Sequence, residues 1–504
     1  MLFGQSSFQS IHQEYLIGEK SRLETIEGMI NMLNDENHIH EGDFSKCLTP
    51  LMMFLEAENM EAIQLKNVAQ RQTSAMAEYL SPSGKFRINY VTSGRDAVPS
   101  DDFNSNGIPD YVEEVAEAAD SSYNHEIINL GFTDPIGEFE VYDVFIEDLS
   151  GFGAYGLTNN RTSGSFPCNN SGPGTCIYIE NDFDGFPPNT DPEGRVIGSI
   201  KVTMAHEFKH SIQFAQNNWQ GDSDRWAEMD ATLMEEVVYD DVNDYYNYIT
   251  GSSSDLFNSP ASSLTAGSYE DVTWALYFHE RFGQDFWPAV WEIIEADIQI
   301  PLVDAIEIEL VSRSISYKEA VLESYLWHFA SGPSFSGTNF GFDERLQYPG
   351  PNLRDQFNSY MTSLNEDISL RLFSGVYYLF DPIEDLKGVV TFNYRVSDPE
   401  IQLGLIQYRI DGTIDTESLI NPSSNQKRQF ASNWSWDNTD KVGLVIVNTS
   451  TDFTHEVSFE FVPGRIFLTQ NFPNPFNPTT VIQLEIPENQ TITLELFDII
   501  GRKI

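Results

Sequence analysis

The residues best suited to chemistry are the two histidines and the glutamate of the segment His206–His210, HEFKH. On an α-helix, positions four apart share one face, so both imidazoles can reach a single metal ion. Glu207 stands beside them and can act as general base towards a water held at that ion. Residues 199–216 carry apolar side chains at helical spacing with no Gly or Pro, which independently predicts the required helix.

We expect a third ligand, Glu228, on the next predicted helix, in the segment 226–232 (WAEMDAT). A zinc site with two histidines and one carboxylate needs such a ligand and keeps a fourth position open for water. The alternative is a solvated helix carboxylate, which is what we expect for the neighbouring Glu235 and Glu236. The W-x-E-x-x-A-T frame favours ligation by Glu228.

HEFKH followed by WAEMDATLMEE resembles the gluzincin metallopeptidases, in which a glutamate on the next helix completes the zinc site. The pattern is most similar to bacterial secreted metalloproteases of that clan, over roughly residues 82–335. The resemblance implies a zincin catalytic domain that hydrolyses peptide bonds. SYEDVTWALYFHERFG is similar to the gluzincin segment with a catalytic tyrosine, which places that role on Tyr269. A phenol there could donate to the oxyanion of the reaction, the alternative being an aromatic packing residue.

Two departures from related aminopeptidases favour an endopeptidase. The interval from the second histidine to Glu228 is slightly shorter, and the chain lacks the GAMEN-type sequence with which those enzymes grip a free amino terminus. Two alternatives remain: a catalytically inactive surface or adhesion protein on a peptidase fold, or an exopeptidase that uses the same zinc site. An inactive protein would be expected to lack a ligand or the base, and all four are present.

A second metal site is predicted in residues 102–113, DFNSNGIPDYVE. Oxygen-bearing residues occupy loop positions 1, 3, 5, 9 and 12 of the EF-hand pattern, and Gly107 allows the sharp turn at position 6. NGIPD resembles thrombospondin type 3 and dockerin-like loops, and a single loop predicts a structural calcium ion. The alternative is an acidic turn that caps the following helix. The predicted calcium ligands are Asp102, Asn104, Asn106, Ile108 (through its carbonyl), Asp110 and Glu113.

The chain has three cysteines. Cys168 and Cys176 flank a loop rich in Gly, Pro and Asn that a disulfide could close, which would indicate an oxidising compartment. Two unpaired thiols are the alternative. Cys47 is left alone: its thiolate could occupy the open zinc position and keep the enzyme latent, although we favour a buried core cysteine.

The pattern of helices and strands that must position these residues predicts a multidomain chain. Residues 1–81 form a helical N-terminal segment, either a pro-region or a plain helical subdomain. Residues 82–345, an α+β pattern with strands first and helices after, form the zincin-like catalytic domain. Within it, residues 176–182 form either an edge strand that pairs with extended substrate or an interior strand. Residues 346–463 contain short strands between turns and predict an all-β sandwich.

Residues 464–504 begin near QNFPNPFNPTT and resemble the type IX secretion C-terminal sorting domain of Bacteroidetes-like bacteria, an Ig-like domain that looks truncated here. The resemblance implies export by the type IX secretion machinery to the medium or the cell surface. A Pro/Asn linker before a terminal hairpin is the alternative. No signal peptide is visible at the N-terminus.

Charge narrows the range of partners. The 504 residues include 28 Lys and Arg against 77 Asp and Glu, a formal net charge of −49. Such a surface repels phosphate backbones, so we expect no nucleic-acid partner. The chain has no apolar run of about 18 residues, so we expect no transmembrane helix. We expect a monomer acting on a protein or peptide substrate.

Overall fold

The structure is a computed structural model. It describes residues 7–34, 46–61, 65, 76–137, 141–168, 174–250, 255–262, 267–357, 364–371, 373–381, 389–394, 399–419, 428–450, 455–461, 467–468, 475, 477–482, 484–485, 493–498 and 500–503. The chain divides into two compact units. The first contains Met1–Ala320, Ser331–Ser334 and Phe342–Pro351, and the second contains Val321–Ala330, Phe335–Gly341 and Asn352–Ile504. Every predicted site residue belongs to the first unit.

The first unit is built on a six-stranded sheet. The pairs β1–β5, β3–β4 and β4–β6 are parallel, whereas β5–β6 and β2–β3 are antiparallel, so the sheet is mixed. Strands β4, β5 and β6 are buried along their whole length. Across the sheet the order is β1 (Lys46–Cys47), β5 (Ala154–Asn159), β6 (Cys176–Ile179), β4 (Tyr142–Ile146), β3 (Phe86–Tyr90) and β2 (Ala77–Leu80).

Strand β6 lies between β5 and β4, so the hypothesis that residues 176–182 form a substrate-binding edge is wrong. A short apolar strand has the same sequence pattern at an edge and inside a sheet, so the sequence alone does not distinguish an edge strand from an interior strand. The position beyond β5 is taken by β1, which comes from the N-terminal segment.

Helix α5 (Arg195–Asn217) packs on this sheet, and the candidate site residues of the HEFKH segment lie on it. It packs against β5 and β6, and against α4 (Asp110–Tyr123) and α6 (Ser223–Val238). It ends at Asn218, whose left-handed backbone (φ 53°) forms the C-cap. After α6 the chain continues with α7 (Tyr246–Ile249), α8 (Val272–Phe282), α9 (Phe286–Ala296) and α10 (Leu302–Ser312), followed by α11 (Tyr317–Phe329), which spans the boundary between the units.

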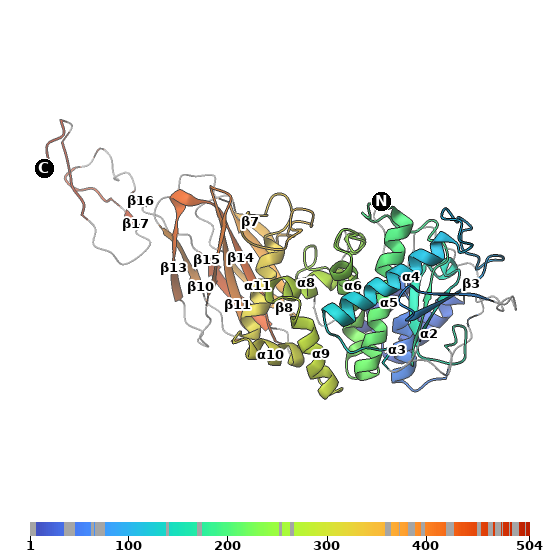
Figure 1. Ribbon diagram of the computed structural model, residues 1–504. Coiled ribbons are helices and arrows are strands. Elements are labelled where there is room, and N and C mark those ends of the chain that lie inside the picture. The colour runs from blue at the N-terminus through green and yellow to red at the C-terminus, as the bar shows by residue number, and fades with distance from the viewer. Residues whose placement is uncertain are drawn as a thin grey trace. The chain divides into compact units, whose positions relative to one another are not determined.

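The N-terminal segment is an integral part of the first unit. Its helices are α1 (Ser7–Leu16), α2 (Arg22–Leu33), which starts with a capping box of Ser21 and Glu24, and α3 (Thr49–Ala57). Their buried apolar side chains share one core with side chains of β5 and β6. In Figure 1 the blue helices α2 and α3 lie in the same body as the green α5. The predicted helices are present, but the segment also supplies β1 and β2 to the sheet.

The second unit is rich in strands, as its sequence predicted. A five-stranded sheet has the order β12-β11-β14-β9-β7 and is antiparallel except for the parallel pair β7–β9. Two further antiparallel pairs are β8–β15 and β10–β13. The strands are β7 (Asp355–Phe357), β8 (Leu364–Leu370), β9 (Gly375–Phe380), β10 (Val389–Tyr394), β11 (Ile401–Arg409), β12 (Ile414–Leu419), β13 (Arg428–Ser435), β14 (Thr439–Asn448) and β15 (His455–Phe461).

Only part of the predicted sorting domain is described. Strands β16 (Phe467–Leu468) and β17 (Leu484–Glu485) pair with each other. Most of the motif at 470–480 lies outside the described residues. The Ig-like fold of this segment and the sandwich of residues 346–463 stay predictions.

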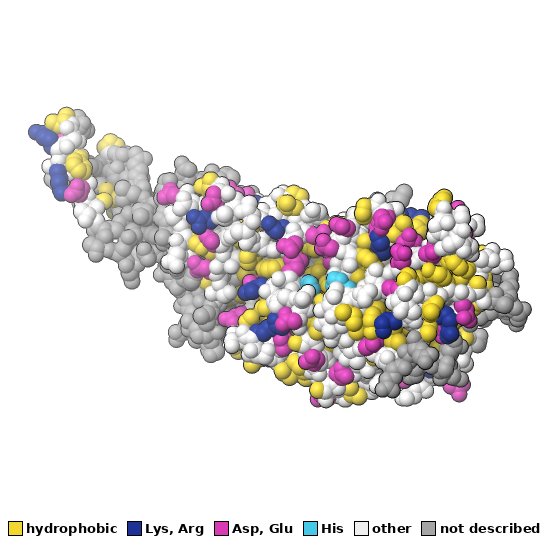
Figure 2. Space-filling model, in the orientation of Figure 1, with side chains coloured by type: hydrophobic (Ala, Val, Ile, Leu, Met, Phe, Trp, Pro, Cys, Tyr) yellow, Lys and Arg dark blue, Asp and Glu magenta, His cyan; other side chains and the backbone are white. Residues whose placement is uncertain are grey.

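At the level of fold class, the chain is mixed α/β, with helices and strands in the first unit and mostly strands in the second. The order of elements in residues 82–345 is less segregated than expected, because α4 intervenes between β3 and β4. Across the part of the chain that the structure describes, no helix is long and apolar enough to cross a membrane. Figure 2 shows Asp and Glu side chains scattered over the face in view, in keeping with the net charge of −49.

Candidate metal centre

Helix α5 presents His206 and His210 from successive turns of one face, and α6 brings Glu228 against them. The Nε2 atoms of the two histidines lie 3.1 Å apart. Glu228 Oε2 lies 3.3 Å from His206 Nε2, and its Oε1 lies 3.1 Å from His210 Nε2. All three side chains are buried. The structure therefore brings the three predicted ligands to one point.

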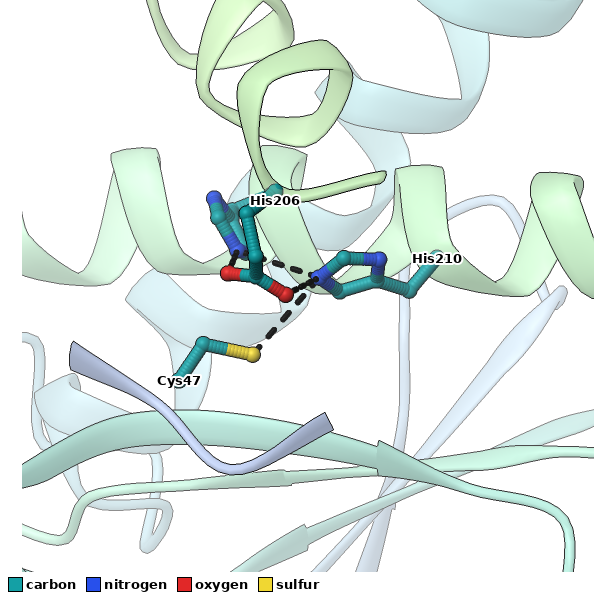
Figure 3. A group of neighbouring side chains, drawn as sticks. Cys47, His206 and His210 are labelled. Carbon is teal, nitrogen blue, oxygen red and sulfur yellow. Dashed lines mark hydrogen bonds and ion pairs between the residues drawn. The ribbon is translucent and has the colours of Figure 1, made fainter. Parts of the chain in front are cut away.

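A fourth side chain joins them from the sheet. Cys47 Sγ lies 3.6 Å from His210 Nε2. Figure 3 shows Cys47 reaching towards His210 from the short N-terminal strand, opposite the helix that carries both histidines. One ligand atom from each of Cys47, His206, His210 and Glu228 lies within 4.8 Å of the others. This buried group could hold a metal ion.

The outward-facing nitrogen of His206 is fixed by a carboxylate. Its Nδ1 lies 2.7 Å from Glu235 Oε1. Glu235 Oε2 in turn accepts from Lys46 Nζ at 2.7 Å, and the same ammonium donates to Asp244 at 2.7 Å. An acceptor at Nδ1 selects the tautomer with its proton there, so that the Nε2 lone pair faces the centre.

His210 is held in the same way. Its Nδ1 lies 2.8 Å from Gln213 Oε1, and the Gln213 amide donates to Asp230 at 2.8 Å and to the Ala227 carbonyl at 3.1 Å. Because the Gln213 side-chain nitrogen donates to these two groups of α6, its oxygen Oε1 is the atom that faces the imidazole ring. Both imidazoles thus have their orientation set before any ion binds.

The pKa shifts describe a site that attracts positive charge. Burial alone would lower the pKa of His206, but the carboxylates of Glu228 and Glu235 outweigh it and raise the pKa to about 10. Burial likewise would raise the pKa of Glu228, yet the two histidines hold it well below its usual range. Burial, with Glu207 and Glu228 adding to it, raises the pKa of the Cys47 thiol. A divalent cation would satisfy these carboxylates and deprotonate the thiol.

Glu207 lies on the sheet side of α5 rather than among the four ligand atoms. Its Oε2 accepts from the hydroxyls of Thr158 (2.9 Å) and Thr49 (3.1 Å). Gly156 of β5 permits this close packing, since a Cβ there would lie 2.9 Å from Glu207 Cγ. The predicted base is therefore buried, oriented by two hydroxyls and adjacent in sequence to a metal-ligand candidate.

Tyr269 lies in the short 3₁₀ turn Tyr269–Asp271 that precedes α8, where Ser268 and Asp271 form a capping box. Its ring centroid is 5.9 Å from that of His206 and 5.3 Å from that of Tyr248. Burial raises the pKa of Tyr269 well above its usual range, and the charges of Glu228 and Cys47 reinforce the effect. Its hydroxyl thus keeps its proton beside the centre and can donate it in a hydrogen bond.

The predicted calcium loop is a compact turn with Gly107 at φ +88°. The backbone N–H groups of Asn106 and Gly107 donate to the Asp102 carboxylate at 3.1 and 2.9 Å. The side-chain amides of Asn104 and Asn106 donate to Glu113 at 2.8 and 2.7 Å.

The other two predicted calcium ligands also lie at this loop. Asp110 accepts from the Phe103 N–H at 3.1 Å, and Ile108 donates its N–H to Asn106 Oδ1 at 2.8 Å. The loop therefore gathers the predicted residues, with the Asn104 and Asn106 amide oxygens accepting backbone N–H groups of the same loop.

Cys168 and Cys176 are joined in a disulfide, and Cys47 is a buried free thiol. The disulfide connects the start of β6 to the loop before it, within the core shared with the N-terminal helices. A disulfide fits an oxidising compartment.

Sequence reasoning missed the groups that support the ligands. Glu235 and Glu236 were expected to be solvated and are buried, 1% and 7% exposed, so that expectation is wrong. Glu235 stands seven positions after Glu228 on the same helical face, and Gln213 stands three after His210, so helical spacing could have found both. Lys46 and Thr158 lie on strands that are far from the histidine motif in the sequence, so no local sequence pattern connects them with the centre.

A scan against models of known protein families found none that matches this chain, and a search of curated proteins found no match either.

Proposed function

We propose that the chain is a secreted zinc-dependent endopeptidase. One observation carries the proposal: two imidazole nitrogens and a carboxylate converge at the separations expected of zinc ligands. A further buried glutamate, Glu207, follows the first histidine on the same helix. The proposed zinc ligands are His206, His210 and Glu228, the general base is Glu207, and Tyr269 is an oxyanion donor.

The separations between donor atoms support zinc. With Zn–N of about 2.05 Å, Zn–O of about 2.1 Å and Zn–S of about 2.3 Å, tetrahedral ligands stand about 3.3 Å (N to N), 3.4 Å (N to O) and 3.6 Å (N to S) apart. The corresponding separations here are 3.1 Å, 3.1 to 3.3 Å and 3.6 Å. The nitrogen, oxygen and sulfur donor set suits zinc better than magnesium or calcium, which prefer oxygen alone.

When bound, zinc would act as a Lewis acid that polarises the scissile carbonyl and lowers the pKa of a water ligand. The protein's own groups would move the protons. Glu207 would take a proton from the attacking water on a carboxylate oxygen and deliver it to the departing amine. The Tyr269 hydroxyl, which stays protonated, would donate to the oxyanion.

Two further proposals concern stability and location. The loop at 102–113 binds a structural calcium ion, supported by the EF-hand spacing and by the gathered side chains of Asp102 and Glu113. The protein is exported by the type IX machinery, supported by the QNFPNPFNPTT motif, and the disulfide suits an extracellular setting. Its substrate class is protein or peptide, bound in extended form.

The test of the proposed function is the conservative variant Glu207→Gln. It keeps the shape of the side chain but cannot accept a proton, so casein hydrolysis should fall at least about 100-fold. Zinc content measured by atomic emission should stay at the wild-type level. Wild-type turnover in this variant would remove Glu207 from the mechanism, and loss of zinc would make it a structural residue instead.

A metal-stabilised surface protein without catalysis is the second candidate. The observation that favours it is Cys47, because four protein side chains around one ion make a closed site of the structural kind. In that case neither the wild-type protein nor any variant that opens the site would hydrolyse casein.

A further inference from the structure

The side chains of residues 46–49 engage the candidate metal centre at three points. Cys47 Sγ approaches His210 at 3.6 Å. Lys46 pairs with Glu235, the carboxylate that orients His206. The Thr49 hydroxyl donates to Glu207, the proposed base. One short stretch of chain therefore reaches a metal ligand, the support of a second ligand, and the base.

The backbone of the same stretch occupies the end of the sheet. Strand β1 pairs in parallel with β5, with Lys46 opposite Ala154 and Cys47 opposite Gly156. The Leu48 N–H also donates to the Gly156 carbonyl at 3.2 Å. Without β1, strand β5 would be the free edge beside the centre, and Gly156 packs directly against Glu207. An exposed edge of this kind is where an extended peptide adds by main-chain hydrogen bonds.

Resting on the proposed zinc site, we propose that residues 46–49 are a built-in inhibitor: Cys47 Sγ is the fourth zinc ligand, and β1 covers the strand edge that extended substrate would use. The thiol gives up its proton when the sulfur binds the ion. Activation then requires the sulfur to leave the ion and β1 to leave β5, whereupon water and substrate take the two positions.

The inhibitor is held firmly because its residues are buried in the folded unit. Lys46 and Cys47 are 1% and 0% exposed, and the helix that follows, α3, contributes Leu51 and Phe54 to the core. Lys46 Nζ is surrounded by the carboxylates of Glu235 and Asp244 and lies 4.5 Å from the ring centroid of Tyr248. The latent form should therefore predominate until the segment is cleaved or displaced.

The test begins with a readout other than hydrolysis. Metal-free protein is loaded with Co²⁺, which takes the same ligands as zinc and shows a near-ultraviolet thiolate-to-cobalt absorption when sulfur is bound. Wild-type protein should show this band, Cys47→Ser should bind Co²⁺ without it, and Leu55→Ala should retain it. Leu55 is a buried residue of α3 that is not among the four candidate metal ligands, so this variant controls for simple loosening of the segment.

Zinc-loaded proteins are then compared on casein. If fewer than about one wild-type molecule in ten has the site open, Cys47→Ser should raise kcat/KM about tenfold or more. An organomercurial reagent added to wild-type protein should abolish the cobalt band and raise hydrolysis without any substitution, because Cys47 is a free thiol whereas Cys168 and Cys176 are joined in a disulfide.

Three outcomes would overturn the proposal, and they separate it from the proposed function. Absence of the cobalt band in wild-type protein would exclude Cys47 as a ligand. A band with equal hydrolysis by wild-type protein and Cys47→Ser would exclude latency while leaving the peptidase in place. A band with no hydrolysis by wild-type protein, variant or mercurial-treated protein would identify a closed structural metal site and end both proposals.

Discussion

At the residue scale, the orientation of the four candidate metal ligands depends on side chains outside that group. His206 is oriented by Glu235, which is itself neutralised by Lys46, and His210 is oriented by Gln213. Such partners fix the tautomer and the ring plane, and they raise the basicity of the ligand nitrogen.

Glu235→Gln should therefore lower zinc affinity about 10- to 100-fold while leaving all three proposed zinc ligands in place. Competition with a chromophoric zinc chelator measures the change. The matched control is Glu307→Gln, an exposed glutamate on α10, which should leave the affinity unaltered. Equal affinities in the two variants would mean that Glu235 contributes only to packing.

The convergence of His206, His210 and Glu228 could be predicted from sequence because its signals are local. HEFKH places both histidines on one face of a helix, and Glu228 lies near the start of the next helix. The contact of Thr49 could not be predicted, and for Cys47 two alternatives stayed open, because the approach of both residues depends on the pairing of β1 with β5, more than a hundred positions away along the chain. The sequence of a two-residue strand does not indicate which other strand it pairs with.

At the element scale, the predicted elements that position the candidate site are present. Residues 199–216 fall within α5, the segment 226–232 falls within α6, and β6 lies within the predicted strand at 176–182. Strand β5 was missed because Gly156 interrupts it, and that glycine is needed for the contact with Glu207. Gly156 thus both breaks the apolar sequence pattern of β5 and leaves room for the Glu207 side chain.

The loop at 102–113 gives a test at this scale, since it leads directly into α4. Calcium at about 1 mM should raise the melting temperature of the wild-type protein, and Asp102→Ala should lose that rise. Differential scanning fluorimetry with and without calcium measures it. Asp101→Ala, the exposed neighbour outside the loop pattern, should keep the rise. A calcium response retained by Asp102→Ala would assign the ion to another place.

At the scale of the whole molecule, the excess of acidic groups extends into the interior. Burial raises the pKa of Glu236 to about 10, and Glu344, Asp240 and Glu280 add to it. Burial also raises the pKa of Glu180 and of Glu280 to about 8. These groups hold protons in the folded protein that they release when it unfolds at neutral pH. Folding stability should therefore fall as pH rises from about 4.5 towards 10.

Glu236→Gln removes the largest of these three pKa shifts without changing the side-chain volume much. The variant should be more stable than the wild-type protein by at least about 1 kcal/mol at pH 9, with a smaller difference at pH 5. Urea unfolding at the two pH values measures this. Glu292→Gln, an exposed glutamate of α9, should show no such pH-dependent gain. A gain for Glu236→Gln that is equal at both pH values would exclude proton linkage as its cause.

The sharing of one folded unit by a disulfide and a free cysteine has a consequence for biogenesis. Three thiols permit three different pairings when the chain first meets an oxidant, and two of them would consume Cys47. A sulfur bound to zinc is withheld from thiol–disulfide exchange. If the ion is acquired before oxidation, Cys168 and Cys176 are left with only each other, and metal loading becomes a safeguard against mispaired product.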